Sequence, residues 1–295
     1  MDEGTHSKEN AMRILILGGD GMLGHRLFRH LNGRHDVRVT LHRNLEAYRE
    51  FGLFTETNAY AGIDMTSLER LSGVVGDFRP EAMINCVGVV KQREEAKSAI
   101  PNLEINALLP HRLAQLAQTT GGRLIQMSTD CVFSGRRGNY RESDPSDAED
   151  LYGRAKFLGE VSDGPCLTLR TSIIGRELSR KTGLLEWFLA QRGKTVKGFR
   201  NAIFSGFTTA EMSRIIEQLL VAHPRASGLY HVSAEAISKY ELLRKINDAL
   251  GLNITVVPES EPRCDRSLDS TRFRDEFGYH PPAWDAMVSE LAKEK

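Results

Sequence analysis

The sequence has few cysteines and no long apolar run. Cysteine accounts for 4 of the 295 residues, and their wide spacing matches neither a zinc site nor a small disulfide framework. We therefore expect reduced thiols in a cytoplasmic protein. No apolar run approaches the roughly 20 residues that cross a bilayer, so we expect no membrane association. Residues 1–11 are polar, lack the apolar region of a signal peptide and are predicted to form a loose tail.

The sequence also lacks an excess of charge of either sign. Lysine plus arginine and aspartate plus glutamate both number 39, so the formal net charge is zero. Proteins that bind nucleic acid along its length need excess positive charge against the phosphate backbone, which argues against nucleic acid as a partner. A small cationic pocket for one phosphate group is compatible with this balance.

Apolar runs alternate with stretches of helical periodicity over the first part of the chain. This alternation predicts crossover connections and an α/β fold, a Rossmann-type doubly wound parallel sheet. The predicted strands are 12–17, 37–41, 82–87, 123–127 and 166–170, with a weaker one ending near 63–64, and the predicted helices are 22–31, 66–78, 103–118 and 150–161.

The alternation becomes less regular after residue 172. We predict a dinucleotide-binding domain over 12–172 and a smaller α+β substrate-binding lobe over 173–295, interleaved with the first domain. The predicted helices of the lobe are 184–191, 209–222, 240–250 and 267–277, and its predicted strands lie near 229–232 and 254–257.

Three glycines follow the first predicted strand. Gly18, Gly21 and Gly24 form a G-x-x-G-x-x-G pattern directly before a predicted helix. In that context the glycines permit a tight turn, approach of the backbone to a pyrophosphate and close packing of helix on strand. The helix N-terminus adds amide donors for the phosphates, so the sequence predicts a dinucleotide cofactor. The other residues of the turn that we expect at the cofactor are Asp20, Met22 and Leu23.

The end of the second predicted strand has no acidic residue. An acid there would accept from the ribose 2′-hydroxyl of NAD. The chain has His42 and Arg43 instead, and an arginine can bind a 2′-phosphate through its planar fork of donors. NADPH is therefore the preferred cofactor and NADH a possible one. The alternative role for Arg43 is that of a solvated loop cation.

Two later segments are also expected to border the cofactor. Asp64 follows the third predicted strand and could accept from the adenine amino group. Cys86, Val87 and Gly88 end the fourth predicted strand, where the backbone must run close to the cofactor.

Tyr152 and Lys156 lie four residues apart in a predicted helix, about one turn apart on one face. A free phenol has a pKa of about 10, so a tyrosine that trades a proton near neutrality needs a nearby positive charge. Thr129 follows the strand 123–127, and its hydroxyl could bind a carbonyl oxygen. We predict Tyr152 as general acid, Lys156 as its electrostatic partner and Thr129 as the group that orients the carbonyl. The alternatives are a surface pair and a threonine that caps a turn.

These motifs resemble those of the extended short-chain dehydrogenase/reductases, and within them the dTDP-4-dehydrorhamnose reductases and their sugar-nucleotide relatives. The resemblance implies a catalytic triad of Thr129, Tyr152 and Lys156, with Asn106 as a helix residue that supports the site. It also implies a nucleotide-sugar substrate and a possible homodimer. The segments that carry the resemblance are 18–24, 106–107, 128–135, 140–145, 152–160, 169–172, 207–209 and 263–269.

The chain departs from the family pattern at one informative place. The 4,6-dehydratases of this superfamily carry an Asp-Glu pair after the threonine, whereas Asp130 is followed here by Cys131. This favours NADPH-dependent reduction of the 4-keto group of a dTDP- or UDP-activated deoxysugar. A sugar-nucleotide epimerase that keeps NAD bound and a non-catalytic regulatory subunit of the same fold are the alternatives. Lys91 or Arg93 could reach an anionic substrate or be solvated loop cations, and no acidic cluster indicates a metal site.

Overall fold

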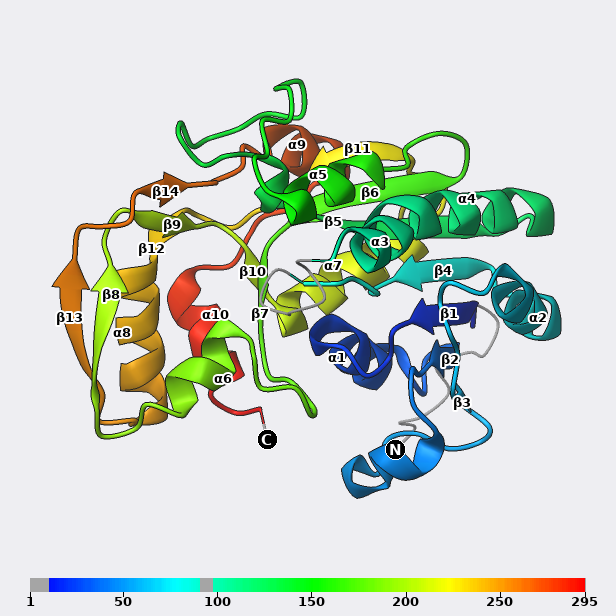
Figure 1. Cartoon of the computed structure of the whole chain (residues 1–295), viewed down its shortest axis with the longest axis horizontal. Helices are drawn as coiled ribbons and strands as arrows, with labels where there is room; N and C mark the ends of the chain where they lie inside the picture. The colour runs from blue at the N-terminus through cyan, green and yellow to red at the C-terminus, as the bar shows by residue number, and fades with distance from the viewer. Residues whose placement is uncertain (1–10, 91–97, 295) are drawn as a thin grey trace, which may run out of the picture.

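The computed structural model describes residues 11–90 and 98–294. Its centre is a parallel sheet with the strand order β11-β6-β5-β4-β1-β2-β3 (Figure 1). Successive strands are added on one side of β1 and then on the other, as in doubly wound folds. The predicted fold class is confirmed. The strands of this sheet are β1 (Arg13–Leu17), β2 (Asp36–Thr40), β3 (Ala59–Tyr60), β4 (Ala82–Asn85), β5 (Arg123–Thr129), β6 (Cys166–Thr171) and β11 (Gly228–His231).

Helices cover both faces of the sheet, and strand β1 shows why its strands are apolar throughout. Ile14 and Ile16 face the core shared with α1 (Met22–Leu31) and α7 (Thr209–Val221). The alternate residues Leu15 and Leu17 face the core shared with α2 (Leu68–Phe78) and α4 (Leu109–Thr120). Side chains alternate across a strand, so a sheet that is covered on both faces needs apolar residues at every position.

A smaller lobe lies beside the carboxyl ends of the sheet strands (Figure 1). In it β8 pairs with β13, and β9 pairs with β12 and β14, while α8 packs on β8 and β13. The remaining elements of this half of the chain are β7 (Ile173–Ile174), α6 (Leu184–Leu189), β8 (Thr195–Phe199), β9 (Ala202–Phe204), β10 (Phe207–Thr208), β12 (Ile237–Ser238), α8 (Lys239–Leu250), β13 (Thr255–Glu259), β14 (Cys264–Asp265), α9 (Thr271–Phe277) and α10 (Trp284–Leu291).

Two elements of the later half of the chain belong to the sheet rather than to the lobe. Strand β11 pairs in parallel with β6 at the edge of the sheet, and α7 packs against α1. The chain therefore leaves the sheet after β6, returns with α7 and β11, and crosses again to the lobe with α8.

The helix predicted over 103–118 is interrupted. The structure has α3 (Ala99–Asn102), a π-helical segment (Leu103–Leu108) and then α4. Pro110 has no backbone N–H and cannot bond to the carbonyl of Asn106 four residues earlier, which explains the change of helix type. The Asn106 carbonyl lies against Gly159, where an added Cβ would be 2.0 Å from the Asn106 oxygen.

Other boundaries also differ from the prediction. Strand β5 continues to Thr129, so Thr129 ends the strand instead of following it, and α9 begins at Thr271 rather than 267. A 3₁₀ turn (Leu45–Phe51), β8, β9 and α10 were not predicted. The short strands of the lobe form because they pair with segments far away in the sequence, which no local pattern records.

Candidate active site

The glycine turn after β1 is held by backbone contacts. Gly18 has a φ of +81°, its N–H donates to the Thr40 hydroxyl at 3.0 Å, and the Gly21 N–H donates to the Gly18 carbonyl at 3.1 Å. A Cβ on Gly24 would lie 2.0 Å from the Gly18 oxygen, so only glycine allows α1 to start this close to the turn. The helix begins at Met22 with Gly21 as its N-cap and no side chain in the capping position. Its N-terminal amides and the bare backbone fit a dinucleotide pyrophosphate.

The side chains of the turn differ in their surroundings. Leu23 is buried in the core, whereas Asp20 accepts a hydrogen bond from the Tyr48 hydroxyl at 3.0 Å. The Asp20 carboxylate also pairs with Arg180 at 3.3 Å. Met22 lies against Gly183, where an added Cβ would be 2.8 Å from the Met22 Cε.

His42 and Arg43 lie just beyond the end of β2, and both side chains are exposed. The Arg43 N–H donates to the Tyr48 hydroxyl at 3.3 Å, and its carbonyl accepts from Gly62 at 3.0 Å. The backbone at this point is fixed while the guanidinium extends into solvent, where a phosphate can reach it.

Asp64 is engaged locally. Its carboxylate accepts from the N–H and the hydroxyl of Thr66, at 2.9 and 2.8 Å, and these bonds lower the pKa of Asp64. The interaction predicted with adenine would have to use the remaining acceptor capacity of the carboxylate.

The backbone that follows β4 is pinned by Asn106. Its amide oxygen accepts from the Val89 N–H at 3.1 Å, and its amide nitrogen donates to the Val89 carbonyl at 2.9 Å. A Cβ on Gly88 would lie 3.3 Å from the same amide oxygen.

The other residues predicted near the end of β4 are Val87 and Cys86. The Val87 N–H donates to the Asn85 side chain, and burial raises the pKa of the Cys86 thiol to about 12. The side chains predicted to meet an anionic substrate, Lys91 and Arg93, lie outside the described residues.

Thr129 and Tyr152 are brought together at the carboxyl end of β5. The Asp150 carboxylate caps α5 (Leu151–Leu158) by accepting from the Gly153 N–H at 2.8 Å. Desolvation of the half-buried Tyr152 raises the pKa of its phenol, and a hydrogen bond with the Thr129 side chain opposes that rise. The Thr129 hydroxyl also accepts from the Cys131 N–H at 3.1 Å. Thr129 thus caps a turn and faces the phenol as well.

Lys156 is buried on the same helix, four residues after Tyr152. Its ammonium donates to the Met127 carbonyl at 2.6 Å, and burial lowers the pKa of Lys156 to about 8. The charge of Glu160 opposes this lowering. The pKa of Tyr152 lies above its ordinary value, the opposite of the lowering expected from Lys156, because desolvation of the phenol and the negative charges of Asp130 and Asp150 all raise it.

A buried network of polar side chains supports the site, and no local sequence pattern predicts it. Arg170 pairs with Glu160 through two bonds of 2.8 and 2.7 Å, and the Ser128 hydroxyl donates to Glu160 at 2.7 Å. Arg170 also lies 3.2 Å from Nε2 of His231, whose Nδ1 is 3.0 Å from the Tyr140 carbonyl. A guanidinium only donates, so we assign Nε2 as the acceptor and Nδ1–H as the donor. Burial and Arg170 lower the pKa of His231 to about 4.

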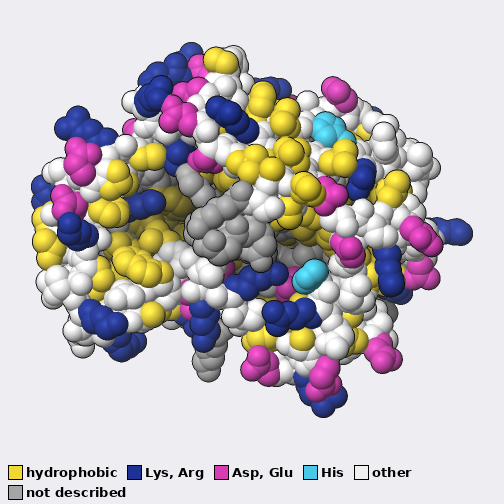
Figure 2. Space-filling model, in the orientation of Figure 1, with side chains coloured by type: hydrophobic (Ala, Val, Ile, Leu, Met, Phe, Trp, Pro, Cys, Tyr) yellow, Lys and Arg dark blue, Asp and Glu magenta, His cyan; other side chains and the backbone are white. Residues whose placement is uncertain are grey.

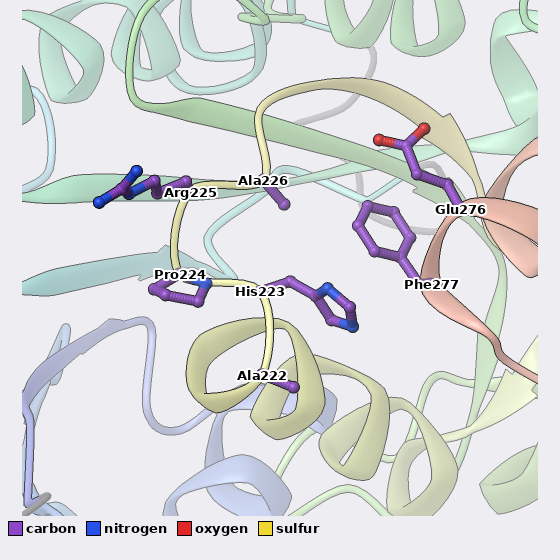
Figure 3. A pocket seen from close by; sticks show the side chains of 7 residues that line it. All are labelled: Ala222, His223, Pro224, Arg225, Ala226, Glu276 and Phe277. Carbon is purple, nitrogen blue, oxygen red and sulfur yellow. The ribbon is translucent and has the colours of Figure 1, made fainter.

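Two open pockets of about 350 and 800 Å³ lie away from these residues. The smaller one lies between the end of α7 and α9, where the rings of His223 and Phe277 pack edge to face with their centroids 4.9 Å apart (Figure 3). The larger one borders Gly228 at the start of β11, at the amino end of that strand. The predicted site lies at the carboxyl ends of the strands, so neither pocket is part of it.

Within residues 11–90 and 98–294, no group of three or more His, Cys, Asp or Glu side chains is arranged to hold a metal ion. The same part of the chain contains no helix that is long and apolar enough to cross a membrane.

Comparison with known proteins places the chain in a family. A family model described as the RmlD substrate binding domain matches residues 12–295. The chain belongs to this family. The match covers the sheet and the lobe together, so the family relationship extends beyond the glycine turn that many dinucleotide-binding proteins share.

The relatives of this chain include proteins of two kinds. A dTDP-4-dehydrorhamnose reductase from Aggregatibacter actinomycetemcomitans is 22% identical over 95% of this chain and 98% of its own. Methionine adenosyltransferase 2 subunit beta from Danio rerio is 27% identical over 81% of this chain and 74% of its own. The crystal structure of dTDP-4-dehydrorhamnose reductase from Bacillus anthracis in complex with NADP has the same fold, with a TM-score of 0.79, 22% identity and coverage of 95% and 98% of the two chains.

Proposed function

We propose that this protein uses NADPH to reduce the 4-keto group of a deoxysugar activated by dTDP or UDP. The observation that carries the proposal is the hydrogen bond between the side chains of Thr129 and Tyr152 at the carboxyl end of β5. The glycine turn follows β1 of the same sheet, at the same end of the strands. The family membership and the reductases among the relatives support the same reaction. Four free cysteines support a cytoplasmic location.

The residues take distinct parts in this reaction. The nicotinamide cofactor supplies the hydride. Tyr152 keeps its proton because its pKa is raised, and it donates that proton to the substrate oxygen as negative charge develops there. The Thr129 hydroxyl orients the same oxygen, and the Lys156 ammonium, four residues further along α5, adds positive charge to the site. Cys131 replaces the dehydratase carboxylate with a thiol whose pKa burial raises to about 12, so it offers no base at neutral pH.

The test is Tyr152→Phe, assayed by NADPH oxidation with dTDP- and UDP-4-keto-6-deoxyhexoses. Turnover should fall by roughly 10²- to 10⁴-fold, as expected for loss of a general acid, while NADPH binding is kept. Tyr60→Phe, which removes a phenol from the outer strand β3, away from β5, is the matched control and should be as active as the wild type. Wild-type protein that binds NADPH but reduces none of these sugars would contradict the proposal.

The similarity to methionine adenosyltransferase 2 subunit beta supports a second candidate, a regulatory subunit of the same fold. In that case Tyr152→Phe would leave the effect on the partner enzyme unchanged. An epimerase would instead be purified with tightly held NAD, which an absorption spectrum of the fresh protein detects.

Arg43 supports the choice of NADPH. Its exposed guanidinium follows β2 at the point where a ribose 2′-phosphate is recognised in folds of this class. Arg43→Ala should weaken binding of NADPH while leaving that of NADH unchanged. Equal losses for both cofactors would count against this role.

We also propose a homodimer, because large apolar side chains gather on one exposed face. Figure 2 shows hydrophobic side chains grouped over α3 and α5. Five large apolar side chains are exposed on α3, on the π-helical segment that follows it and on α5: Ile100, Leu103, Leu108, Phe157 and Leu158 are 71, 41, 44, 42 and 57% exposed. Monomeric proteins rarely expose such a group. Leu158→Glu should convert a dimer into a monomer in analytical ultracentrifugation, and a wild-type monomer would exclude the assembly.

A further inference from the structure

The glycine turn contains an acidic residue where a neutral one would suit the cofactor better. Asp20 is 8% exposed and lies between Gly18 and Gly21, at the place where the turn fits a pyrophosphate. A carboxylate beside phosphate groups repels them, and the repulsion is strong where water is partly excluded. The turn therefore needs a device that offsets the charge of Asp20.

The structure supplies two partners for the Asp20 carboxylate, and both approach its Oδ2 atom. The Tyr48 hydroxyl donates to it at 3.0 Å, and Arg180 donates from Nη2 at 3.3 Å. Tyr48 is neutral, so Arg180 carries the compensating charge. It lies 160 residues further along the chain, in the loop that joins β7 to α6.

Hydrogen bonds within this loop fix its conformation. The Glu177 carboxylate accepts from the backbone N–H groups of Thr182 and Gly183, which closes the loop on itself. Gly183 packs on the Met22 side chain of the glycine turn. The loop therefore meets the turn at two points, an apolar contact and the Asp20–Arg180 ion pair.

We propose that Arg180 is a positioning residue for the cofactor, which neutralises Asp20 so that the turn can accept phosphate groups. The loop after β7 thereby makes cofactor affinity depend on the half of the chain that builds the smaller lobe. The inference rests on the proposed function only in that the turn binds a nicotinamide dinucleotide.

The test measures the Kd for binding of NADPH to the full chain. The fluorescence of NADPH is followed as the protein is titrated in, with no substrate present. Arg180→Ala should raise the Kd of NADPH about tenfold or more, because it leaves the Asp20 carboxylate without a compensating positive charge beside the phosphates. Added salt should narrow the difference from the wild type, since the cause is electrostatic.

Asp20→Asn in the Arg180→Ala background is the decisive variant. Asparagine keeps an oxygen that can accept from the Tyr48 hydroxyl but carries no charge. If Arg180 acts by neutralising Asp20, the double variant should bind NADPH within about threefold of the wild type. A merely structural role for Arg180 would not be rescued in this way.

Arg176→Ala is the matched control. Arg176 lies in the same loop, its side chain is 38% exposed against 37% for Arg180, and it pairs with Glu186 at 3.4 Å instead of reaching the turn. This variant should bind NADPH like the wild type. Thermal unfolding of each variant shows whether it is folded during the titration.

Three results would overturn the inference. One is an unchanged Kd for Arg180→Ala when the wild type binds NADPH. Another is a double variant as weak as Arg180→Ala, which would mean that Arg180 acts on the cofactor directly. The third is an equal loss in Arg176→Ala. Wild-type protein that binds neither NADPH nor NADH would refute the proposed function itself, and the inference with it.

Discussion

Two regions at the same edge of the sheet achieve their geometry in opposite ways. The glycine turn after β1 presents backbone amides, and its shape depends on atoms that are missing, since an added Cβ on Gly24 would meet the Gly18 oxygen at 2.0 Å. The end of β5 presents side chains, and these are held by buried charges around Glu160 and Arg170. The backbone of the turn is therefore sensitive to the size of the side chain at Gly24, whereas the geometry at the end of β5 is sensitive to charge.

This difference has consequences for how each region fails. The backbone contacts of the turn are local or reach a neighbouring strand, so steric damage to the backbone stays there until the turn no longer forms. The side chains of Asp20 and Met22 make its contacts with the distant loop after β7. The network at β5 joins β5, β6, β11 and the residues after α5 through Ser128, Glu160, Arg170 and His231. Loss of one charge there leaves its partner buried and unpaired, which is costly at a distance from the substrate.

The largest expected effect is that of Gly24→Ala. The added Cβ meets backbone that cannot move aside, so we expect destabilisation of roughly 4 kcal/mol or more and loss of NADPH binding. Gly76→Ala is the control, because an added Cβ at this exposed helical position has nothing within 4 Å and should stabilise by about 0.5–1 kcal/mol. Chemical denaturation measures both, and a folded Gly24→Ala protein of normal stability would refute the steric account.

Glu160→Gln comes next. It removes the charge that pairs with Arg170, whose side chain is 4% exposed, and should lower the free energy of unfolding by about 3–5 kcal/mol. Glu46→Gln breaks the exposed pair with Arg49 and should change stability little. Urea titrations of the two variants compare a buried with a solvated ion pair. Similar values would mean that the network at β5 is not held by charge.

The pH dependence of stability tests His231. Its pKa is lowered from 6.5 to about 4 in the folded chain, so between these values the unfolded state binds a proton that the folded state excludes. Stability should therefore fall by about 3 kcal/mol as the pH drops from 6.5 to 4. His231→Asn keeps an N–H donor and does not titrate, so its curve should be flatter. An identical slope in both proteins would assign the acid sensitivity to other groups.

The smallest effect concerns Lys156. Its pKa of about 8 makes it an ammonium below pH 8 and a neutral amine above. If the proposed reaction needs this charge, kcat/KM should decline by up to about tenfold per pH unit above pH 8, because this parameter reports groups of the free enzyme. A profile that stays level to pH 9.5 would separate Lys156 from the chemistry. Circular dichroism over the same range serves as the control for folding.

The two regions also differ in how far the sequence predicts them. The strand, the glycines and the helix of the cofactor turn follow one another in the chain, so their spacing alone predicts the turn, and α1 begins and ends where the periodicity indicates. The roles given to Thr129, Tyr152 and Lys156 stay predictions. The structure adds that Thr129 ends β5 and that the Lys156 ammonium contacts the Met127 carbonyl.

The sequence by itself determined the alternation of strands and helices, the cofactor turn and the family to which the chain belongs. Each of these is a local pattern of size, polarity or backbone freedom. The tertiary structure decided which charged and polar side chains, far apart in the sequence, pair with one another. Arg180 reaches Asp20 across 160 residues, and Arg170 lies between Glu160 and His231 on different strands and loops. Such pairs form because the sheet brings the ends of its strands together, and sequence separation carries no record of that proximity.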